Sequence, residues 1–375
     1  MLIGIDGNEA NIKRRVGVNQ YAFEILWGIY RLHKLWSKKH KVIVYLKNPP
    51  ISKLPTPKKS FSYRILPGGG AWVVSKLTPN LLFASEKPDV FFSPHHYTPP
   101  FSTIPLVCSI HDLGYLKFSG QFKKYDFWQL KYWSAWSIFI SKHIISVSNS
   151  TRDDIVRLYP FASIKTSVVY HGYDKKRFNR LINADDVRRT KEKHSIVNDY
   201  LLFLGTLKPS KNIEGIVGAF GIIKKEFPDL SLVIAGKKGW LYETIFQKVQ
   251  SLRISDVIFT DFVPEEDKPG LIKGAKAFLM PSFWEGFGMD AVSAMAVGTP
   301  VVASREGGLP EACGQAAIMV DPQSVESIAE AVKKVLSMGK TEYNTLIESG
   351  FRQASKFSWE KAAEKTLKIL EEAGS

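Results

Sequence analysis

The chain has 375 residues, of which 45% are hydrophobic and 12% aromatic. This length is long for one ordinary domain and suits two, and the apolar content excludes an intrinsically disordered chain. The charge is uneven, because residues 1–180 hold 27 Lys and Arg against 10 Asp and Glu, whereas residues 181–375 hold 24 against 26. The basic half is expected to attract an anionic substrate or surface, and nucleic acid and a membrane face are both candidate partners.

The composition also bears on the compartment. Cys108 and Cys313 lie far apart and show neither metal-ligand spacing nor a disulfide framework, which fits a reducing cytoplasm. The chain begins with an apolar strand pattern rather than a signal peptide, and its longest uncharged run, 90–111, contains four prolines that disfavour a membrane-spanning helix. We therefore expect a cytoplasmic protein whose basic half could meet the inner face of the plasma membrane.

In the first half, short β-branched runs alternate with segments of helical periodicity. Such alternation predicts a parallel sheet with helices on both faces. The predicted strands are 2–6, 42–45, 63–66, 90–93, 106–110, 144–147 and 167–169, and the predicted helices are 19–37, 126–140 and 150–158.

The charge-dense stretch 174–198 interrupts this pattern and is predicted to be a linker. A second alternating series follows it, with strands at 201–204, 231–235, 257–260, 277–280, 301–303 and 317–320, and helices at 212–226, 242–252, 266–275, 290–297 and 324–336. The tail from Thr341 is helical in pattern and ends with 359–372. We expect two doubly wound α/β domains, 1–180 and 181–355, and a closing helix within 356–375 that crosses back to the first domain. Ligands of such sheets bind at the carboxyl ends of the strands, so the cleft between the domains is the expected site.

The most informative segment is 281–304, which reads PSFWEGFGMDAVSAMAVGTPVVAS. A predicted strand runs into a turn containing Glu285, Gly286 and Gly288, and an alanine-rich helix and a second strand follow. The backbone N–H groups at the start of such a helix suit an anionic phosphate, and the Glu285 carboxylate could accept a hydrogen bond from a sugar hydroxyl. A βαβ element whose glycines only make a tight turn is the alternative.

Polar loops follow the neighbouring strands of this half. The segment 204–212 (LGTLKPSKN) closes the first strand, 235–240 (AGKKGW) follows the second, and 260–264 (TDFVP) follows the third. Since the carboxyl ends of parallel strands share one edge of a sheet, we expect the three loops at one site. A solvated basic loop is the alternative reading of 204–212.

Together these segments resemble the retaining glycosyltransferases of family 4, the glycosyl transferases group 1, and most closely their mannosyltransferase-like branch. The resemblance implies the GT-B fold, in which two Rossmann-like domains face a central cleft. In the family the first loop supplies an arginine and a lysine that neutralise the donor diphosphate. Lys211 matches the lysine, whereas Thr206 and Ser210 stand at the arginine positions, so Lys208 is expected to supply part of the charge.

The resemblance assigns roles in segment 281–304 as well. Glu285 matches the first of two glutamates that stand eight residues apart, but Ser293 occupies the second, ribose-binding position, and Asp290 replaces a proline. Losing that charge-assisted contact would cost on the order of 1.5–3 kcal/mol of binding, so reduced activity is one expectation. The other residues that the resemblance places at the donor nucleotide and diphosphate are Gly236, Lys237, Val263, Phe287, Gly288 and Met289.

Two residues of the first half complete the assignment. Gly17, in RRVGVNQY, resembles the glycine loop that lets the diphosphate and the acceptor approach the backbone. His111, in SIHDL, resembles the histidine that contacts the donor sugar, and a histidine that caps a strand is the structural alternative. His95 and His96 follow another predicted strand and receive no role.

The resemblance thus implies a retaining hexosyltransferase in surface polysaccharide synthesis, with His111 and Glu285 as its catalytic residues. It would move a hexose, with mannose favoured, from a nucleoside-diphosphate sugar to a glycan or a polyprenyl- or lipid-linked acceptor. GDP-mannose is favoured over UDP-sugars as co-substrate, and no other cofactor is expected. The sequence has no Asp-x-Asp pattern and no His/Cys cluster, so we expect metal-independent transfer in which fixed dipoles and cations stabilise the leaving group. The alternatives are a degenerate relative that only binds a nucleotide or a glycan, and a nucleic-acid binder, which ranks below it.

Segment 122–140 (FKKYDFWQLKYWSAWSIFI) is rich in Trp, Tyr and Lys. A buried helix is the default prediction for it. The alternative is an aromatic and basic face that lies on a membrane, to which 31–41 (RLHKLWSKKHK) could contribute.

Overall fold

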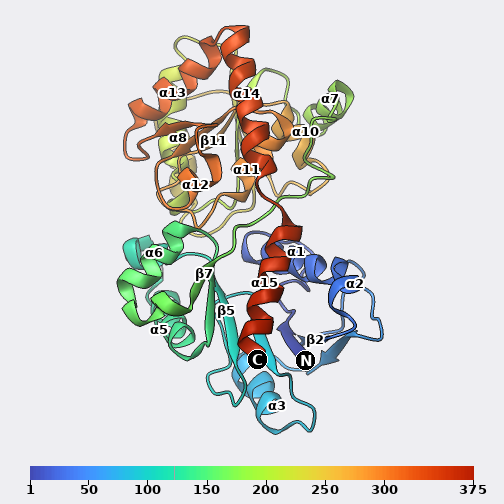
Figure 1. Ribbon diagram of the computed structural model, residues 1–375. Helices are drawn as coiled ribbons and strands as arrows, with labels where there is room; N and C mark the ends of the chain where they lie inside the picture. Colours follow the sequence, from blue (N-terminus) through green and yellow to red (C-terminus); the bar gives the residue numbers. More distant parts are fainter. Residues whose placement is uncertain (122) are drawn as a thin grey trace. The chain divides into compact units, whose positions relative to one another are not determined.

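The computed structural model describes residues 1–121 and 123–375, which form two compact units (Figure 1). The first unit comprises Met1–Gly172 and Ser358–Ser375, and the second comprises Tyr173–Phe357. The chain passes to the second unit after Gly172, eight residues before the predicted boundary at residue 180. Arg177 is already bonded to Glu265 of the second unit. Phe122, the first residue of the aromatic segment, lies outside the described residues.

The first unit is built on a sheet of seven parallel strands in the order β3-β2-β1-β4-β5-β6-β7. The strands are β1 Leu2–Asp6, β2 Lys41–Leu46, β3 Phe61–Ile65, β4 Val90–Ser93, β5 Leu106–Ile110, β6 His143–Ser146 and β7 Thr166–Val168. The helices are α1 Val18–Arg31, α2 His33–Trp36, the π-helix η1 Val73–Leu77, α3 Thr78–Phe83, α4 Gly114–Lys117, α5 Lys124–Ile140, α6 Asn149–Leu158, α15 Trp359–Gly374 and the 3₁₀ turns η2 Ser119–Gln121 and η3 Pro160–Lys165.

The second unit has a sheet of six parallel strands in the order β10-β9-β8-β11-β12-β13. The strands are β8 Tyr200–Leu204, β9 Ser231–Ala235, β10 Val257–Asp261, β11 Ala277–Met280, β12 Val301–Ser304 and β13 Ile318–Val320. The helices are α7 Ala184–Lys193, the 3₁₀ turn η4 Pro209–Lys211, α8 Ile213–Ile223, α9 Glu243–Ser251, α10 Lys268–Lys273, α11 Met289–Val297, α12 Leu309–Cys313, α13 Val325–Ser337 and α14 Lys340–Ser355.

The central strands of both sheets are buried along their whole length and consist mostly of apolar residues. Every residue of β4, β5, β8, β9 and β11 is buried, as parallel strands require. In each sheet the strand order reverses once, between β1 and β4 and between β8 and β11. In open sheets of this kind, ligands bind at the carboxyl ends of the two strands between which the order reverses. The predicted α/β class with parallel sheets is therefore confirmed.

Helix α11 is enclosed by the second unit. Its residues Ala291 through Val297 are all buried, and α10, α12 and α14 pack on it. The small side chains allow this close packing, and the helix ends at Gly298, whose φ of 82° suits glycine. The start of α11 is thereby held rigidly at the carboxyl end of β11.

Two predictions of secondary structure are wrong. The stretch 174–198 is not simply a linker, because it contains α7, which packs on α10 through Thr190 and Gly270. A Cβ at Gly270 would lie 2.4 Å from Thr190 Oγ1, so only glycine permits this contact. The predicted helix 19–37 is divided at Leu32 into α1 and α2.

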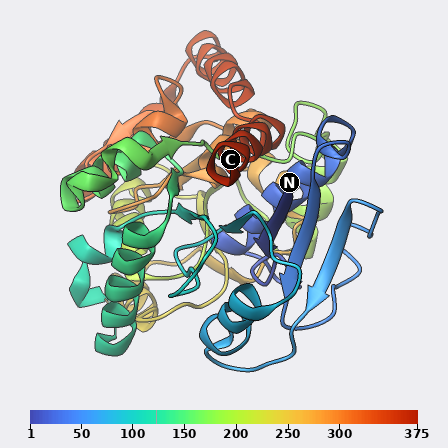
Figure 2. The same cartoon turned by 60° about the horizontal axis from the view of Figure 1, so that its bottom comes forward.

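Helix α15 packs on α1, and its end lies beside the start of β1, as Figures 1 and 2 show. Gly28 of α1 makes the close approach possible, because a Cβ there would lie 2.6 Å from Ala363 Cβ and 3.2 Å from Trp359 O. A Cβ at Gly172 would lie 2.1 Å from Trp359 N. The closing helix thus belongs to the first unit.

We predict that Gly28→Val destabilises the first unit by about 1–3 kcal/mol, the usual cost of overpacking a tight contact. The measurement is thermal unfolding followed by circular dichroism. Gly70→Val is the control, because a Cβ at Gly70 meets nothing within 4 Å. Equal melting temperatures for the two variants would contradict the proposed packing role of Gly28.

Candidate active site

An ion pair crosses the reversal point of the second sheet. Lys211 ends the turn that follows β8, Glu285 follows β11, and the Lys211 ammonium donates to Glu285 Oε1. Ser282 Oγ donates to the same oxygen at 2.8 Å. The two charged side chains are only 16% and 13% exposed. The structure therefore brings together the two charged residues that the sequence analysis assigned to the diphosphate and to the sugar.

The loop that carries Glu285 is held by its neighbours. Asn212, with a φ of 54°, donates through Nδ2 to Pro281 O at 3.1 Å and to Pro322 O at 2.6 Å. Ser304 Oγ donates to Ser282 O at 2.6 Å. These bonds tie the loops after β8, β11 and β13 into one rigid edge, so the position of the Glu285 carboxylate is fixed by several strands.

A further loop, which the sequence analysis did not assign, supports Glu285 from behind. The Gly308 N–H donates to Glu285 O at 2.8 Å. A Cβ at Gly307 would lie 2.2 Å from Glu285 O, and one at Gly308 would lie 2.2 Å from Gly286 O. The sequence did contain a feature that could have indicated this loop, since two adjacent glycines follow the predicted strand 301–303.

The start of α11 points its backbone donors toward this edge. Gly288 precedes the helix with a φ of 107°, and the first bond within the helix runs from Val292 N to Gly288 O at 3.3 Å. The N–H groups of Met289, Asp290 and Ala291 lie in the first turn, where no carbonyl of the helix can reach them. Such a terminus attracts anions; the assignment of Phe287, Gly288 and Met289 to the diphosphate stays a prediction.

Asp290 places a carboxylate in that first turn. Burial raises its pKa, the positive charges of Lys268 and Lys211 oppose this shift, and Glu265 and Glu285 add to it. Asp290 therefore shares its electrostatic environment with the Lys211–Glu285 pair.

Ser293 is turned into the helix. Its hydroxyl donates to Met289 O at 3.1 Å, and the residue is 6% exposed. Because its proton is already used in this bond, the Ser293 hydroxyl could only accept a hydrogen bond from a nucleotide ribose. Its role in ribose binding stays a prediction.

The loops after β8, β9 and β10 are linked to one another. Gly205 N donates to Ala235 O at 2.9 Å, and Gly236 N donates to Asp261 O at 2.8 Å. Gly236 has a φ of 143°, and a Cβ there would lie 1.8 Å from Gly205 O. Only glycine fits this position. The observed role of Gly236 is therefore to let the loops after β8 and β9 pack closely together.

The remaining assigned residues lie on these same loops. Lys237 is exposed and its carbonyl accepts from Leu207 N at 2.9 Å, and Thr206 is half-buried. The Lys208 ammonium lies 5.2 Å from the centre of the Trp240 ring. Val263 is 2% exposed, so its side chain belongs to the core and only its backbone could contact a nucleotide.

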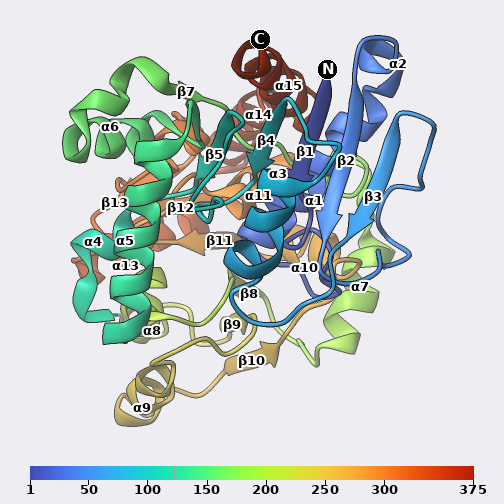
Figure 3. The ribbon, with the colours of Figure 1, turned by 90° about the horizontal axis from the view of Figure 1, so that it is seen from below.

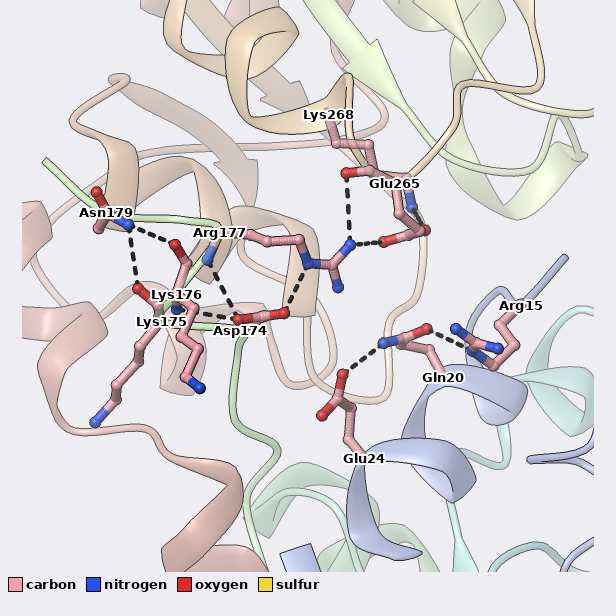
Figure 4. A network of polar contacts seen from close by, with 10 residues as sticks. All are labelled: Arg15, Gln20, Glu24, Asp174, Lys175, Lys176, Arg177, Asn179, Glu265 and Lys268. Atoms are coloured by element: carbon pink, nitrogen blue, oxygen red, sulfur yellow. Dashed lines mark hydrogen bonds and ion pairs between the residues drawn. The ribbon is translucent and has the colours of Figure 1, made fainter. Parts of the chain in front are cut away.

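A polar network adjoins the loop after β10 (Figure 4). Arg177 donates to Asp174 Oδ2 at 2.7 Å and to Glu265 Oε2 at 2.9 Å, and Lys268 donates to the other oxygen of Glu265. Burial alone would raise the pKa of Asp174 and of Glu265, but the basic partners outweigh it and lower both. The network fixes the first residues of the second unit and holds Lys268 at the start of α10, where its charge acts on Asp290.

In the first unit, His111 follows β5 and its Nε2 donates to Pro94 O at 3.0 Å. The ring packs edge-on against Tyr21, with centres 4.6 Å apart. Burial lowers the pKa of His111 to about 4, although its bond to Pro94 O opposes the shift. A neutral ring that donates from Nε2 keeps Nδ1 as an acceptor, which suits a hydroxyl donor.

His95 and Asp6 form a buried pair at the reversal point of the first sheet, which the sequence analysis left without a role. His95 Nε2 lies 3.2 Å from Asp6 Oδ2, and His95 Nδ1 accepts from Tyr97 N at 3.0 Å. His95 therefore donates from Nε2 to the carboxylate. The sequence could have indicated this pair, because Asp6 ends the first predicted strand and His95 closely follows the fourth.

Gly17 precedes α1 with a φ of 49°, and a Cβ there would meet nothing within 4 Å. Backbone conformation, not lack of space, thus favours glycine at this position. Arg15 beside it donates to Gln20 Oε1 at 3.3 Å, and Gln20 donates to Glu24 Oε1 at 2.8 Å (Figure 4).

Over residues 1–121 and 123–375, no group of three or more His, Cys, Asp or Glu side chains is placed to hold a metal ion. In the same part of the chain, none of the helices has the length and apolar character needed to cross a bilayer.

Comparison with known families agrees with this architecture. The model of the glycosyl transferases group 1 matches residues 186–372, and that of Glycosyltransferase Family 4 matches residues 28–177. The two matches cover the parallel sheet of the second unit and most of that of the first. The chain belongs to the glycosyl transferases group 1, a family of glycosyltransferase enzymes.

Curated relatives include two proteins of Escherichia coli. O-antigen chain mannosyltransferase B is 29% identical over 238 residues, which are 62% of this chain and 61% of that protein. The serotype-specific mannosyltransferase WbdA is 26% identical over 318 residues, which are 80% of this chain and 39% of that protein. The chain thus matches less than two thirds of the length of either relative.

Solved structures show the same fold. The sucrose-phosphate synthase of Thermosynechococcus elongatus has a TM-score of 0.76 at 18% identity, with 99% of this chain and 98% of that chain covered. HepE of Anabaena, in complex with UDP and glucose, has a TM-score of 0.75 at 16% identity, with 99% of each chain covered. These likenesses confirm the GT-B fold with its two Rossmann-like domains.

We predict that His111 stays neutral until the pH falls to about 4. Its pKa in the folded state lies below the unfolded value of about 6.5, so the unfolded state binds the proton first. The free energy of unfolding should therefore fall as the pH drops from about 6.5 to about 4. Histidine NMR titration of the protein and of His111→Gln tests this, and a His111 midpoint near 6.5 would contradict it.

We predict that Asp290→Asn stabilises the protein at neutral pH. The folded pKa of Asp290 is raised, so its ionisation favours the unfolded state once the pH exceeds about 3.9. The gain in melting temperature should vanish at pH values where Asp290 is protonated in both states. Asp229→Asn, at an exposed position, is the control. A gain that does not depend on pH would show that the charge is not its cause.

Proposed function

We propose that this chain is a retaining hexosyltransferase that takes a hexose, with mannose favoured, from a nucleoside-diphosphate sugar. The observation that carries the proposal is the Lys211–Glu285 pair at the reversal point of the second sheet, beside the start of α11. Membership of the glycosyl transferases group 1 supports it. The relatives named mannosyltransferases favour mannose, and we therefore favour GDP-mannose as the donor.

In this proposal the donor diphosphate lies against the backbone of Phe287, Gly288 and Met289. The dipole of α11 and the ammonium of Lys211 neutralise its charge. An ammonium has three donors, so Lys211 can keep its bond to Glu285 and still donate to phosphate oxygens. Because Lys211 is only 16% exposed, its charge is screened less than that of a surface lysine.

Glu285 would accept hydrogen bonds from sugar hydroxyls. One of its oxygens already accepts from Lys211 and Ser282, so the carboxylate is oriented before the donor arrives. Preorganisation of this kind avoids an ordering cost during the reaction. His111, a neutral acceptor in the first unit, would contact a sugar hydroxyl through Nδ1.

The transfer itself breaks the bond between the anomeric carbon and the diphosphate oxygen and forms one to the acceptor oxygen on the same face. The acceptor hydroxyl proton passes to the departing diphosphate oxygen. We assign no protein nucleophile and no base. The fixed cation and the helix dipole stabilise the negative charge that develops on the leaving diphosphate, so we propose that the step needs no metal ion.

The acceptor that we propose is a glycan or a polyprenyl- or lipid-linked saccharide of a surface polysaccharide. The relative named for O-antigen chains supports this choice. It would place the reaction in the cytoplasm, at the inner face of the plasma membrane. No role for nucleic acid is proposed.

The test measures donor binding by calorimetry, with GDP-mannose, UDP-glucose and UDP-N-acetylglucosamine, for the protein and for Glu285→Gln. Loss of a charge-assisted hydrogen bond costs on the order of 1.5–3 kcal/mol. We therefore expect Glu285→Gln to weaken binding of the true donor sugar by about 10- to 150-fold, with little effect on the free nucleoside diphosphate.

Glu348→Gln is the matched control, since Glu348 of the same unit also forms an ion pair, with Arg180, but lies on α14 outside these loops. Lys211→Met should weaken both the nucleotide sugar and the free diphosphate. Binding without hydrolysis or transfer would support the degenerate, non-catalytic alternative. Equal affinity of the protein and Glu285→Gln for every donor would overturn the site.

A further inference from the structure

Helix α5 packs on the first sheet through one of its faces. Ser134, Ser137 and Ile138 are the buried residues of α5. Ser137 Oγ donates to His96 O at 2.6 Å and accepts from Thr98 Oγ1 at 2.8 Å. Figure 3 shows α5 along the side of the unit, next to β5. Phe127 and Leu130 are partly buried against the same core, so this face of α5 is already occupied by contacts within the protein.

The opposite face of α5 carries a stripe of exposed aromatic rings. Spacings of three and four residues place these rings on one side of a helix. The exposed fractions are 77% for Tyr125, 46% for Trp128, 65% for Tyr132, 42% for Trp136 and 61% for Phe139. The default prediction of a buried helix is therefore wrong for these residues. So large an exposed apolar surface marks an interaction site.

All the rings of the stripe except Phe139 line a groove of about 550 Å³, together with Trp133, Val74 and Pro100. The polar atoms of its indoles are partly used inside the protein, because Trp136 Nε1 donates to Pro100 O at 3.0 Å and Trp133 Nε1 donates to Thr98 O at 3.2 Å. Gln129 supplies the one side-chain amide of the lining. A glycan would need several hydrogen-bond partners for its hydroxyls, so the groove suits hydrocarbon better.

Lysines lie beside the N-terminal part of the stripe. Lys131 Nζ lies 4.9 Å from the ring centre of Trp128, and Lys123 and Lys124 stand at the start of the helix. Asp126 is the only acidic residue of α5. The basic excess of residues 1–180 gives this part of the chain a general attraction to anionic surfaces. Trp and Tyr beside Lys is the composition of surfaces that lie in the interface of an anionic bilayer.

We propose that the aromatic stripe of α5 and its lysines form a docking surface for an anionic lipid bilayer, with the groove taking up the apolar part of the interface. The charge decides against a second copy of this chain, because two such faces would bring like charges together. The inference goes beyond the proposed transfer reaction and does not depend on it.

The experiment uses the full chain and unilamellar vesicles. Sedimentation compares vesicles of equal parts phosphatidylcholine and phosphatidylglycerol with vesicles of phosphatidylcholine alone. We expect binding to the anionic vesicles that weakens with salt. The variant Trp128→Ser/Tyr132→Ser should reduce the partition coefficient at least tenfold, since it removes two rings from the interface. Lys124→Gln and Lys131→Gln should each reduce it about fivefold.

The control is Leu181→Ser/Val197→Ser, which removes two side chains of the second unit that are 85% and 84% exposed. It should bind vesicles like the parent. All these variants should keep the same affinity for the donor nucleotide, so failure of membrane docking and failure of the donor site are distinguishable. Unchanged vesicle binding in Trp128→Ser/Tyr132→Ser would overturn the proposal. Equal binding to neutral and anionic vesicles would also overturn it. A third contradicting result would be a dimer, detected by light scattering, that dissociates in Trp128→Ser/Tyr132→Ser.

Discussion

The reversal of strand order between β8 and β11 is the constraint on which the candidate site depends. In open α/β sheets, ligands bind at the carboxyl ends of the strands at such a reversal. Lys211 comes from one loop and Glu285 from the other, so their ion pair exists only because the strands are neighbours. The pair holds a cation and a carboxylate ready beside the start of α11.

Glycine makes this edge compact enough to be rigid. The approach of Gly236 to Gly205 and of Gly307 and Gly308 to the Glu285 loop leaves no room for a Cβ. Burial of α11 on all sides adds to this rigidity. The site thus combines fixed backbone donors with a preformed ion pair, which is the arrangement that stabilises charge developing on a leaving group.

The first unit uses its reversal point differently. Asp6 and His95 pair between β1 and β4, and His111 lies beyond β5 as a neutral acceptor. The same unit carries the exposed aromatic stripe of α5 and most of the excess positive charge. In our proposals the second unit binds the donor diphosphate, whereas the first unit carries His111 and the surface that docks on a membrane.

The sequence by itself determined the sheets and the position of the candidate site at the ends of their strands. Strands buried on both faces are continuous apolar runs, and Glu285, Lys211 and the helix start follow such runs directly. Only the tertiary structure decided that Ser293 bonds to Met289 O, that 184–193 is a packed helix, and that α5 turns its aromatic rings outward. The reason is physical. Aromatic residues around a whole helix leave no single apolar face, and the direction of a side chain depends on neighbours that are distant in sequence.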